Sequence, residues 1–275
     1  MSPFPASRGQ TEHWDHFGFG VEDGVATVTL ERPAALNALT FDVYADLRDL
    51  LAELPHRDDV RVLVVTGAGR AFCSGGDVNE IIGRLQGMSP GERLEFTRMT
   101  GAVVQGMRSC PQPIVAAVNG VAAGAGAVIA LAADLRVVAR SASFAFLFTR
   151  VGLAGADMGC AYLLPRLVGL GRASELLLLG DPVDAERALE LGLVTELVDD
   201  DELPVATERL ARRLAEGPTL AYASTKLLLS RELDLDLAGA LELDATTQAL
   251  LMGSRDHGEF HRAFGEKRPP RWSGR

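Results

Sequence analysis

The hydrophobic pattern of the chain becomes regular only after residue 20. Residues 1–20 carry no clear periodicity and are predicted to form a flexible N-terminal arm. Val25–Leu30 is then a short run of β-prone residues, which Pro33 ends. From Phe41 onward the apolar residues fall at helical spacing, and Thr40 stands where an N-cap belongs. This first segment therefore predicts a strand followed by a capped helix.

Apolar runs and helical patterns alternate through the middle of the chain. Val62–Thr66 and Pro113–Val118 are continuous apolar runs with the length of buried strands, and Glu92–Met107 and Ala127–Ala133 have the pattern of helices. Such alternation favours an α/β fold. Two further short strands are predicted at Leu135–Ala139 and Phe144–Phe148.

The pattern changes in the last third of the chain. After Gly169 the β signal nearly disappears, and Thr219–Met252 is rich in alanine and leucine with a helical pattern. No long linker or low-complexity tract separates the two parts. We therefore predict a strand-rich core over residues 21–205 and a helical C-terminal region over residues 206–275.

Two glycine-rich turns share one design, in which a buried strand leads through small residues into a helix. They are Ala71–Asp77 (AFCSGGD) and Asn119–Gly126 (NGVAAGAG). Missing side chains let a ligand approach the backbone, and a helix N-terminus presents free N–H groups. Two such groups facing one oxygen would form an oxyanion hole. For either turn alone, tight turn geometry is the simpler explanation. The chain has no dinucleotide fingerprint, phosphate loop or nucleophile elbow.

Composition narrows the classes of function. The chain has 275 residues, of which 47% are hydrophobic and 23% charged, enough for a sizeable core. Its net charge of -10 makes nucleic acid an unlikely partner. The three cysteines have no metal-ligand spacing, and His257 and His261 lack a third ligand, so no metal site is predicted. We expect a cytoplasmic protein, because the N-terminus has no apolar signal core and polar residues interrupt the apolar stretch 113–138.

Several segments carry a family resemblance. Val25–Leu39 (VATVTLERPAALNAL), both glycine turns, Leu164–Gly169 and Ala263–Arg268 resemble the enoyl-CoA hydratase/isomerase (crotonase) superfamily, in order and over about residues 20 to 270. The resemblance implies a crotonase-like spiral of ββα units with a helical C-terminal region. It also implies a homo-oligomer, either a trimer or a dimer of trimers. The implied partner is an acyl-CoA thioester, whose coenzyme A is part of the substrate, so no separate cofactor is expected.

The resemblance also implies roles for individual residues. The thioester carbonyl is expected between the backbone N–H groups of Gly76 and Ala125, and Ser74 is expected near the adenine. Asp77 should stand at the start of the helix that follows. Phe264 and Lys267 match a family pair that helps to hold coenzyme A, often from a neighbouring subunit.

The departures from the family pattern concern the acids. Typical hydratases carry glutamates where this chain has Val128 and Phe148, neither of which can hold or protonate a water. These residues predict an apolar acyl pocket that favours a bulky or cyclic acyl group. Asp157 remains, in a register that resembles the catalytic aspartate of dienoyl-CoA isomerases and 4-chlorobenzoyl-CoA dehalogenases. It could instead be the N-cap of a helix over Met158–Leu164, and both readings stay open.

The sequence thus predicts an enzyme that stabilises a thioester enolate in a backbone oxyanion hole, with Asp157 as acid/base. Apolar neighbours would raise the pKa of Asp157 and suit proton transfer. The reaction could be hydration, double-bond isomerisation, or hydrolysis of a cyclic or aromatic acyl-CoA. The missing glutamates also allow an alternative, a homologue that binds CoA esters and has lost catalysis.

Overall fold

The computed structural model describes residues 10–275 and contains two sheets. The larger sheet has six strands in the order β1-β2-β3-β5-β7-β10, all parallel to their neighbours except β1, which is antiparallel to β2. Its register aligns Val64 of β3 with Val115 of β5. The strands are β1 (Gly18–Glu22), β2 (Val25–Leu30), β3 (Val62–Gly67), β5 (Ile114–Val118), β7 (Leu135–Ala139) and β10 (Glu196–Val198).

The smaller sheet has four strands in the order β4-β6-β8-β9. Strands β4, β6 and β8 are parallel, and β9 pairs antiparallel with β8. Along the chain, β3, β5 and β7 in the large sheet are followed by β4, β6 and β8 in the small one. The strands are β4 (Ala71–Cys73), β6 (Val121–Ala123), β8 (Ser143–Ala145) and β9 (Val183–Asp184).

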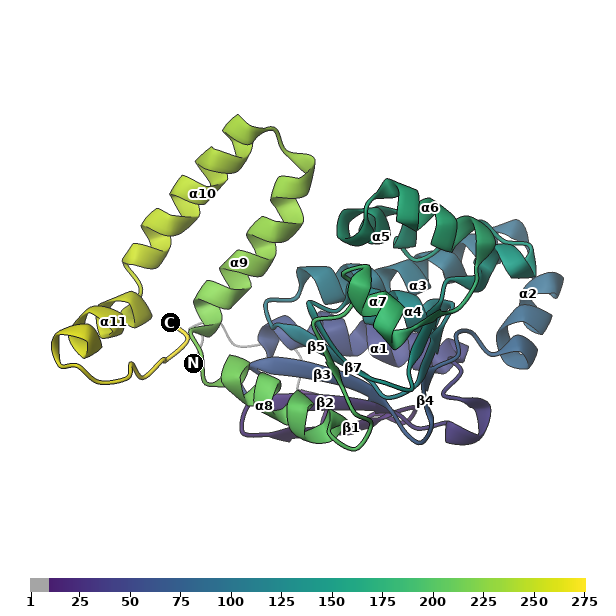
Figure 1. Cartoon of the computed structure of the whole chain (residues 1–275), viewed down its shortest axis with the longest axis horizontal. Helices are drawn as coiled ribbons and strands as arrows, with labels where there is room; N and C mark the ends of the chain where they lie inside the picture. Colours follow the sequence, from purple (N-terminus) through teal and green to yellow (C-terminus); the bar gives the residue numbers. More distant parts are fainter. Residues whose placement is uncertain (1–9) are drawn as a thin grey trace.

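Helices follow each of these strand pairs, so a ββα unit repeats three times and the chain winds as a spiral (Figure 1). This confirms the predicted α/β spiral of ββα units. After β4 come η3 (Val78–Ile82), α2 (Gly83–Gly87) and α3 (Pro90–Ser109); after β6 comes α4 (Ala125–Ala132); after β8 come η4 (Leu147–Val151), α5 (Cys160–Val168) and α6 (Leu170–Leu179). The other core helices are η1 (Pro33–Ala35), α1 (Phe41–Glu53), η2 (Leu54–His56), α7 (Ala185–Glu190) and α8 (Leu203–Ala215).

Local signals explain where these elements begin and what they bury. Thr40 caps α1 as predicted, since its hydroxyl accepts the Val43 N–H at 3.3 Å. A capping box of Ser89 and Glu92 starts α3. Every residue of β5 and of α4 is buried, so these two elements form the centre of the hydrophobic core.

Four sequence predictions need correction. Residues 14–20 do not belong to a flexible N-terminal arm, because Trp14 and Phe17 are buried and stacked and β1 begins at Gly18; residues 1–9 lie outside the described part. The strand predicted over Phe144–Phe148 ends at Ala145, and the chain turns into η4 instead. Two short strands, β9 and β10, follow Gly169. The predicted boundary between residues 205 and 206 falls within α8, which packs on β3, β5 and β7.

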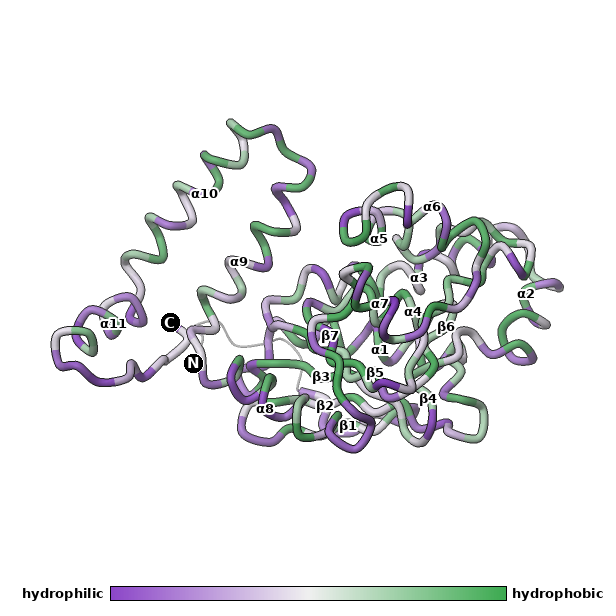
Figure 2. Tube along the Cα trace, in the orientation of Figure 1, coloured by the Kyte–Doolittle hydropathy of each residue, from purple (hydrophilic) through white to green (hydrophobic). Residues whose placement is uncertain are grey.

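The last helices form an arm that projects from the core (Figure 1). It consists of α9 (Thr219–Arg231), η5 (Glu232–Asp234), α10 (Leu237–Met252) and α11 (Arg255–Gly265). Hydrophobic residues recur along α9 and α10 without a core to cover them (Figure 2). Within this arm the large exposed apolar side chains are Leu220, Leu227, Leu229, Leu233, Leu237, Leu241, Leu250, Met252, Phe260 and Phe264.

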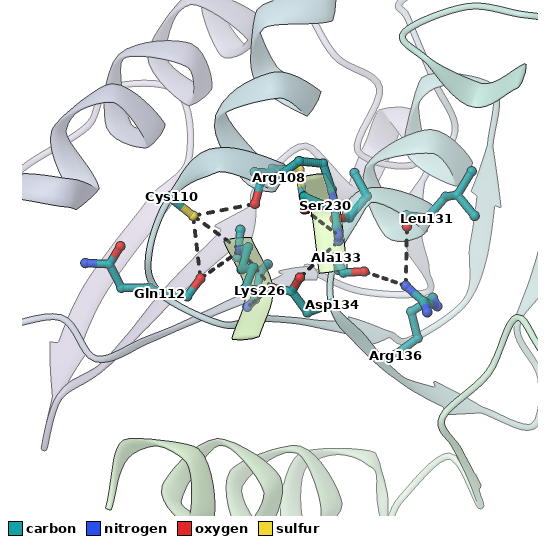
Figure 3. Close-up of polar contacts among 12 residues, drawn as sticks. Arg108, Cys110, Gln112, Leu131, Ala133, Asp134, Arg136, Lys226 and Ser230 are labelled. Atoms are coloured by element: carbon teal, nitrogen blue, oxygen red, sulfur yellow. Dashed lines mark hydrogen bonds and ion pairs between the residues drawn. The ribbon is translucent and has the colours of Figure 1, made fainter. Parts of the chain in front are cut away.

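A buried polar cluster connects α9, the first helix of this arm, to the core (Figure 3). The base of the arm is this contact region of α9. The Lys226 ammonium lies 2.7 Å from an Asp134 carboxylate oxygen and donates to the Gln112 carbonyl at 2.8 Å. Arg108 contacts the other Asp134 oxygen at 3.0 Å and donates to Ser230 of α9. Asp134 thus contacts two cations, Lys226 of α9 and Arg108 of α3, where the arm meets the core. No helix among residues 10–275 is long and apolar enough to cross a membrane.

Candidate active site

The three parallel strands of the small sheet bring the two glycine turns together. Because β4, β6 and β8 are parallel neighbours, their carboxyl ends meet at one edge of the sheet. Ser74–Gly76 leave that edge after β4, Gly124 and Ala125 after β6, and Phe146–Phe148 after β8. Ligand sites of parallel sheets are commonly built at such an edge. The topology thus places the predicted oxyanion residues and the predicted apolar wall at one location.

The two turns are in direct contact, and their glycines permit it. Gly75 has a φ of +101°, and a Cβ on it would lie 3.0 Å from the Ala123 carbonyl oxygen and 3.5 Å from the Ala125 nitrogen. A Cβ on Gly126 would overlap the backbone of Cys73. The backbone angle favours glycine at position 75, and the spacing to Cys73 requires it at position 126. The glycines therefore serve the approach of one turn to the other, beyond the needs of either turn alone.

The N–H groups of Gly76 and Ala125 make no hydrogen bond within the described part of the chain. Leu39 pairs on either side of Gly76: its N–H donates to the Gly75 carbonyl at 2.8 Å, and its carbonyl accepts the Asp77 N–H at 2.8 Å. Ala125 is the first residue of α4, whose opening N–H groups have no partner inside the helix. Both groups are thus available to an acceptor from outside the chain.

Ser74 and Asp77 have protein partners that fix the first turn. The Ser74 N–H donates to the Leu36 carbonyl at 3.0 Å, and its hydroxyl to the Ala35 carbonyl at 3.3 Å. The Asp77 carboxylate accepts the N–H groups of Asn79 and Glu80 at the start of η3, as predicted. Hydrogen bonding from Glu80 above all, with the ion pair to Arg32 at 3.0 Å, lowers the pKa of Asp77. An ionised Asp77 therefore stabilises the turn that carries Gly76.

The positions of the family glutamates are apolar and enclosed. Val128 lies on the second turn of α4 with no exposed surface, and Phe148 of η4 is also buried. Glu80, a carboxylate that follows the first turn, is paired with Arg32, whose guanidinium lies 3.3 Å from it. Neither apolar residue can position a water, so an acid for this edge of the sheet must come from another segment.

Asp157 lies just before α5, and its surroundings differ from those of a helix cap. Helix α5 begins at Cys160 with Gly159 at the N-cap position and without a side-chain cap, so the cap predicted for a helix starting at Met158 is wrong. The Asp157 carboxylate accepts the N–H of its neighbour Met158 at 2.8 Å. Burial raises the pKa of Asp157. The direction of this shift agrees with the predicted acid/base role of Asp157, which stays a prediction.

The buried thiols of Cys73, in β4, and Cys160, at the start of α5, are unreactive. Burial, above all, raises the pKa of Cys73 to about 12. Burial, and next the charge of Asp157, raises the pKa of Cys160 to about 12. Both thiols therefore stay protonated at neutral pH and cannot act as nucleophiles.

Tyr44 of α1 is a polar residue of this region that the sequence pattern did not reveal. Its side chain is buried, and burial, followed by the charges of Cys73 and Asp157, raises its pKa well above the usual value. Helical spacing identified it only as part of the apolar face of α1. The single available signal was the presence of a hydroxyl on that face.

Phe264 and Lys267 are not brought to the glycine turns of the same chain. Both lie at the end of α11, on the opposite side of the molecule from α4 and β4 (Figure 1). Phe264 is 76% exposed. Contact of these residues with coenzyme A therefore requires a second subunit and stays a prediction.

A metal site and a large cavity are the alternatives to a site at this edge of the sheet. Within residues 10–275 no group of three His, Cys, Asp or Glu side chains could hold a metal ion. A cavity of about 680 Å³ lies between α8 and the large sheet, but none of the predicted site residues line it. The carboxyl edge of the small sheet therefore stays the predicted location of the chemistry.

Comparison with known proteins assigns the family. The sequence profile described as Enoyl-CoA hydratase/isomerase matches residues 20–275. The chain belongs to this family. Among the relatives of this enoyl-CoA hydratase/isomerase member, the 1,2-epoxyphenylacetyl-CoA isomerase of Escherichia coli K12 is 39% identical over 93% of this chain and 97% of its own. A probable enoyl-CoA hydratase of Rhodobacter capsulatus is 40% identical over 94% and 97% of the two chains.

Solved structures of enoyl-CoA hydratases have the same fold. A Streptomyces coelicolor A3(2) protein that carries an enoyl-CoA hydratase assignment is 61% identical, with a TM-score of 0.98 over the whole of both chains. The enoyl-CoA hydratase of Bacillus anthracis is 30% identical, with a TM-score of 0.88 over 95% of this chain and 100% of its own. The prediction of an enzyme with the crotonase fold is confirmed.

Proposed function

We propose that this family member binds an acyl-CoA thioester with its carbonyl oxygen between the N–H groups of Gly76 and Ala125. The observation that carries the proposal is the contact between two turns whose N–H groups have no partner in the described chain. The positive end of the α4 dipole adds to this field. Each such donor contributes about 10²- to 10³-fold in rate when charge develops on the oxygen. The species stabilised is the enolate of the thioester.

Asp157 is the proposed proton carrier for this enolate. Its raised pKa keeps it close to the range in which a carboxyl both takes and returns a proton. Val128 and Phe148 leave no second acid for concerted water addition to an enoyl group. Isomerisation, or hydrolytic chemistry on a bulky or cyclic acyl group, therefore fits better than simple hydration. The name of the 39% identical E. coli relative, which describes an isomerase of an aromatic acyl-CoA, supports this choice.

The complete site is proposed to form in a trimer or a dimer of trimers. The arm exposes apolar side chains along α9 and α10, which a second copy could cover. Phe264 and Lys267 would then approach the coenzyme A of a neighbouring subunit. A cytoplasmic location remains the expectation, since coenzyme A esters are the proposed substrates.

The test is turnover by an Asp157→Asn variant. Crotonyl-CoA should be hydrated weakly, and aryl or cyclic acyl-CoA esters should be converted faster. On the best of these substrates the variant should bind normally and turn over about 100-fold more slowly, or worse, the scale of acid–base contributions. Asp181→Asn, which changes an exposed carboxylate paired with Arg150, is the matched control. Full turnover by Asp157→Asn would exclude Asp157 as the proton carrier.

A further inference from the structure

Tyr44 combines a buried ring with a hydroxyl that has no protein partner. The side chain is 3% exposed, and its hydroxyl makes no hydrogen bond to any residue between 10 and 275. Five buried polar atoms of the described chain are both sealed from solvent and unpaired, and the Tyr44 hydroxyl is not among them. The Tyr44 hydroxyl is therefore unpaired within residues 10–275 and is not completely sealed from solvent. A buried tyrosine hydroxyl normally has a hydrogen-bond partner, which here lies outside residues 10–275.

The position of Tyr44 is fixed relative to the proposed oxyanion hole. Helix α1 starts immediately after Leu39, the residue that pairs with the backbone on both sides of Gly76. Tyr44 follows one turn later, about 5 to 6 Å along the helix axis, and its N–H donates to the Thr40 carbonyl at 3.1 Å. The segment that carries Gly76 therefore also determines where Tyr44 lies.

The aromatic ring of Tyr44 is held by its neighbours. It packs edge-on against Phe96 of α3, with centroids 5.8 Å apart and an interplanar angle of 86°. Phe96 also packs edge-on against Phe41, at 5.1 Å. Ordered rings of this kind leave the hydroxyl little freedom, so it is a directed donor.

Two groups of the candidate site influence the pKa of Tyr44. The thiol of Cys73, at the end of β4, and the carboxyl of Asp157 both raise its pKa after burial itself. Asp157 and Tyr44 are nevertheless not hydrogen-bonded to each other. The phenol hydroxyl and the carboxyl therefore do not satisfy each other, which leaves the Tyr44 hydroxyl available to a ligand atom.

We propose that the Tyr44 hydroxyl donates a hydrogen bond to an oxygen on the acyl group, beyond the thioester carbonyl, and so makes the enzyme selective for oxygen-bearing acyl-CoA esters. Tyr44 is then a specificity-determining residue of the acyl pocket. This inference rests on the proposed acyl-CoA function and narrows its substrate class. A hydrocarbon acyl group would leave the buried hydroxyl without a partner, whereas an ether, hydroxyl, oxo or epoxide oxygen would accept its proton.

The experiment measures binding of matched ligands by calorimetry. 3-Phenylpropionyl-CoA is compared with 3-hydroxy-3-phenylpropionyl-CoA and with 3-(4-hydroxyphenyl)propionyl-CoA, which place an oxygen on the β-carbon or on the ring. The wild type should bind at least one oxygenated ester about tenfold more tightly than the hydrocarbon ester, the factor that one net hydrogen bond supplies. Tyr44→Phe, which keeps the ring contact with Phe96, should bind the hydrocarbon ester normally and lose this preference.

The outcomes separate the inference from the proposed function. Equal binding of all three esters by the wild type overturns the role of Tyr44, and so does a preference that persists in Tyr44→Phe. If none of the esters binds, the acyl-CoA function itself is wrong. Tyr162→Phe is the control, because its hydroxyl donates to Asp234 at 2.6 Å on the outside of α5, and it should retain the wild-type preference.

Discussion

Replacing Asp134 by Asn should destabilise the protein more than any other single change at the base of the arm. Asp134 accepts the Ile114 N–H at 2.8 Å and contacts both Arg108 and Lys226. The Lys226 side chain is only 6% exposed. Arg136 lies two residues after Asp134, and its burial lowers the pKa of its guanidinium to about 10. The negative charge of Asp134 opposes this lowering. Without that charge, three cations share a poorly hydrated region.

The magnitude follows from this arrangement. Removing one partner of a buried ion pair costs about 3–5 kcal/mol, because the other charge stays buried without compensation. Asparagine can still accept the Ile114 N–H, so the lower end, about 3 kcal/mol, is expected. Lys226→Met should cost less, about 1–2 kcal/mol, since Asp134 keeps Arg108 and the Ile114 N–H while methionine fills the volume.

The assay is urea unfolding followed by circular dichroism at equal protomer concentration, because association contributes to apparent stability. Glu186→Gln serves as the reference for an exposed pair with Arg140 and should change stability by less than about 1 kcal/mol. If Asp134→Asn proves no more destabilising than Lys226→Met, charge balance does not control the attachment of the arm. The cluster would then act only through packing.

Three further predictions concern binding, assembly and pH. Calorimetry should show far tighter binding of an acyl-CoA than of its free acid, and equal affinities would contradict a coenzyme A site. Light scattering should report a trimer or hexamer, and an active monomer would rule out a site completed by Phe264 and Lys267. Because burial raises the pKa of folded Asp157, the native state holds its proton to higher pH than the unfolded chain. The stability of the wild type relative to Asp157→Asn should therefore fall as pH rises above the ordinary aspartate range. Thermal unfolding of both proteins across pH measures this difference. A relative stability that rises with pH would show that the folded protein favours the charged form of Asp157.

The alternation of elements was predictable because buried strands and amphipathic helices have different periods. The predicted strands Val62–Thr66 and Pro113–Val118 agree to within one residue with β3 and β5. Thr40 is the N-cap of α1, as its hydroxyl indicated. Periodicity did not reveal that strands alternate between two sheets. That pairing depends on long-range contacts, and it was expected only through the family resemblance.

The error at Phe144–Phe148 has a specific physical cause. Five apolar or aromatic residues in a row suit a buried strand, but they also suit any buried segment. Here Phe146 turns the chain out of β8 with φ -93° and ψ 62°, and Phe146 and Phe148 are buried in a turn rather than in a sheet. This turn brings Phe148 to the edge where the glycine turns end. The departure from regular structure is therefore what places the apolar wall in the candidate site.

Asp157 and Tyr44 show why local signals could not complete the site. Asp157 precedes a helix, so sequence alone left capping and acid chemistry as equal alternatives. Gly159 occupies the cap position, which excludes the first alternative, and the burial of Asp157 by distant segments supports the second, which stays a prediction. Tyr44 was correctly predicted to face the core, yet its significance depends on the location of its hydroxyl relative to Asp157, far along the chain. Both residues acquire their chemistry from tertiary contacts. A change at either one therefore tests the assembled pocket, whereas a change at Thr40 tests only a helix end.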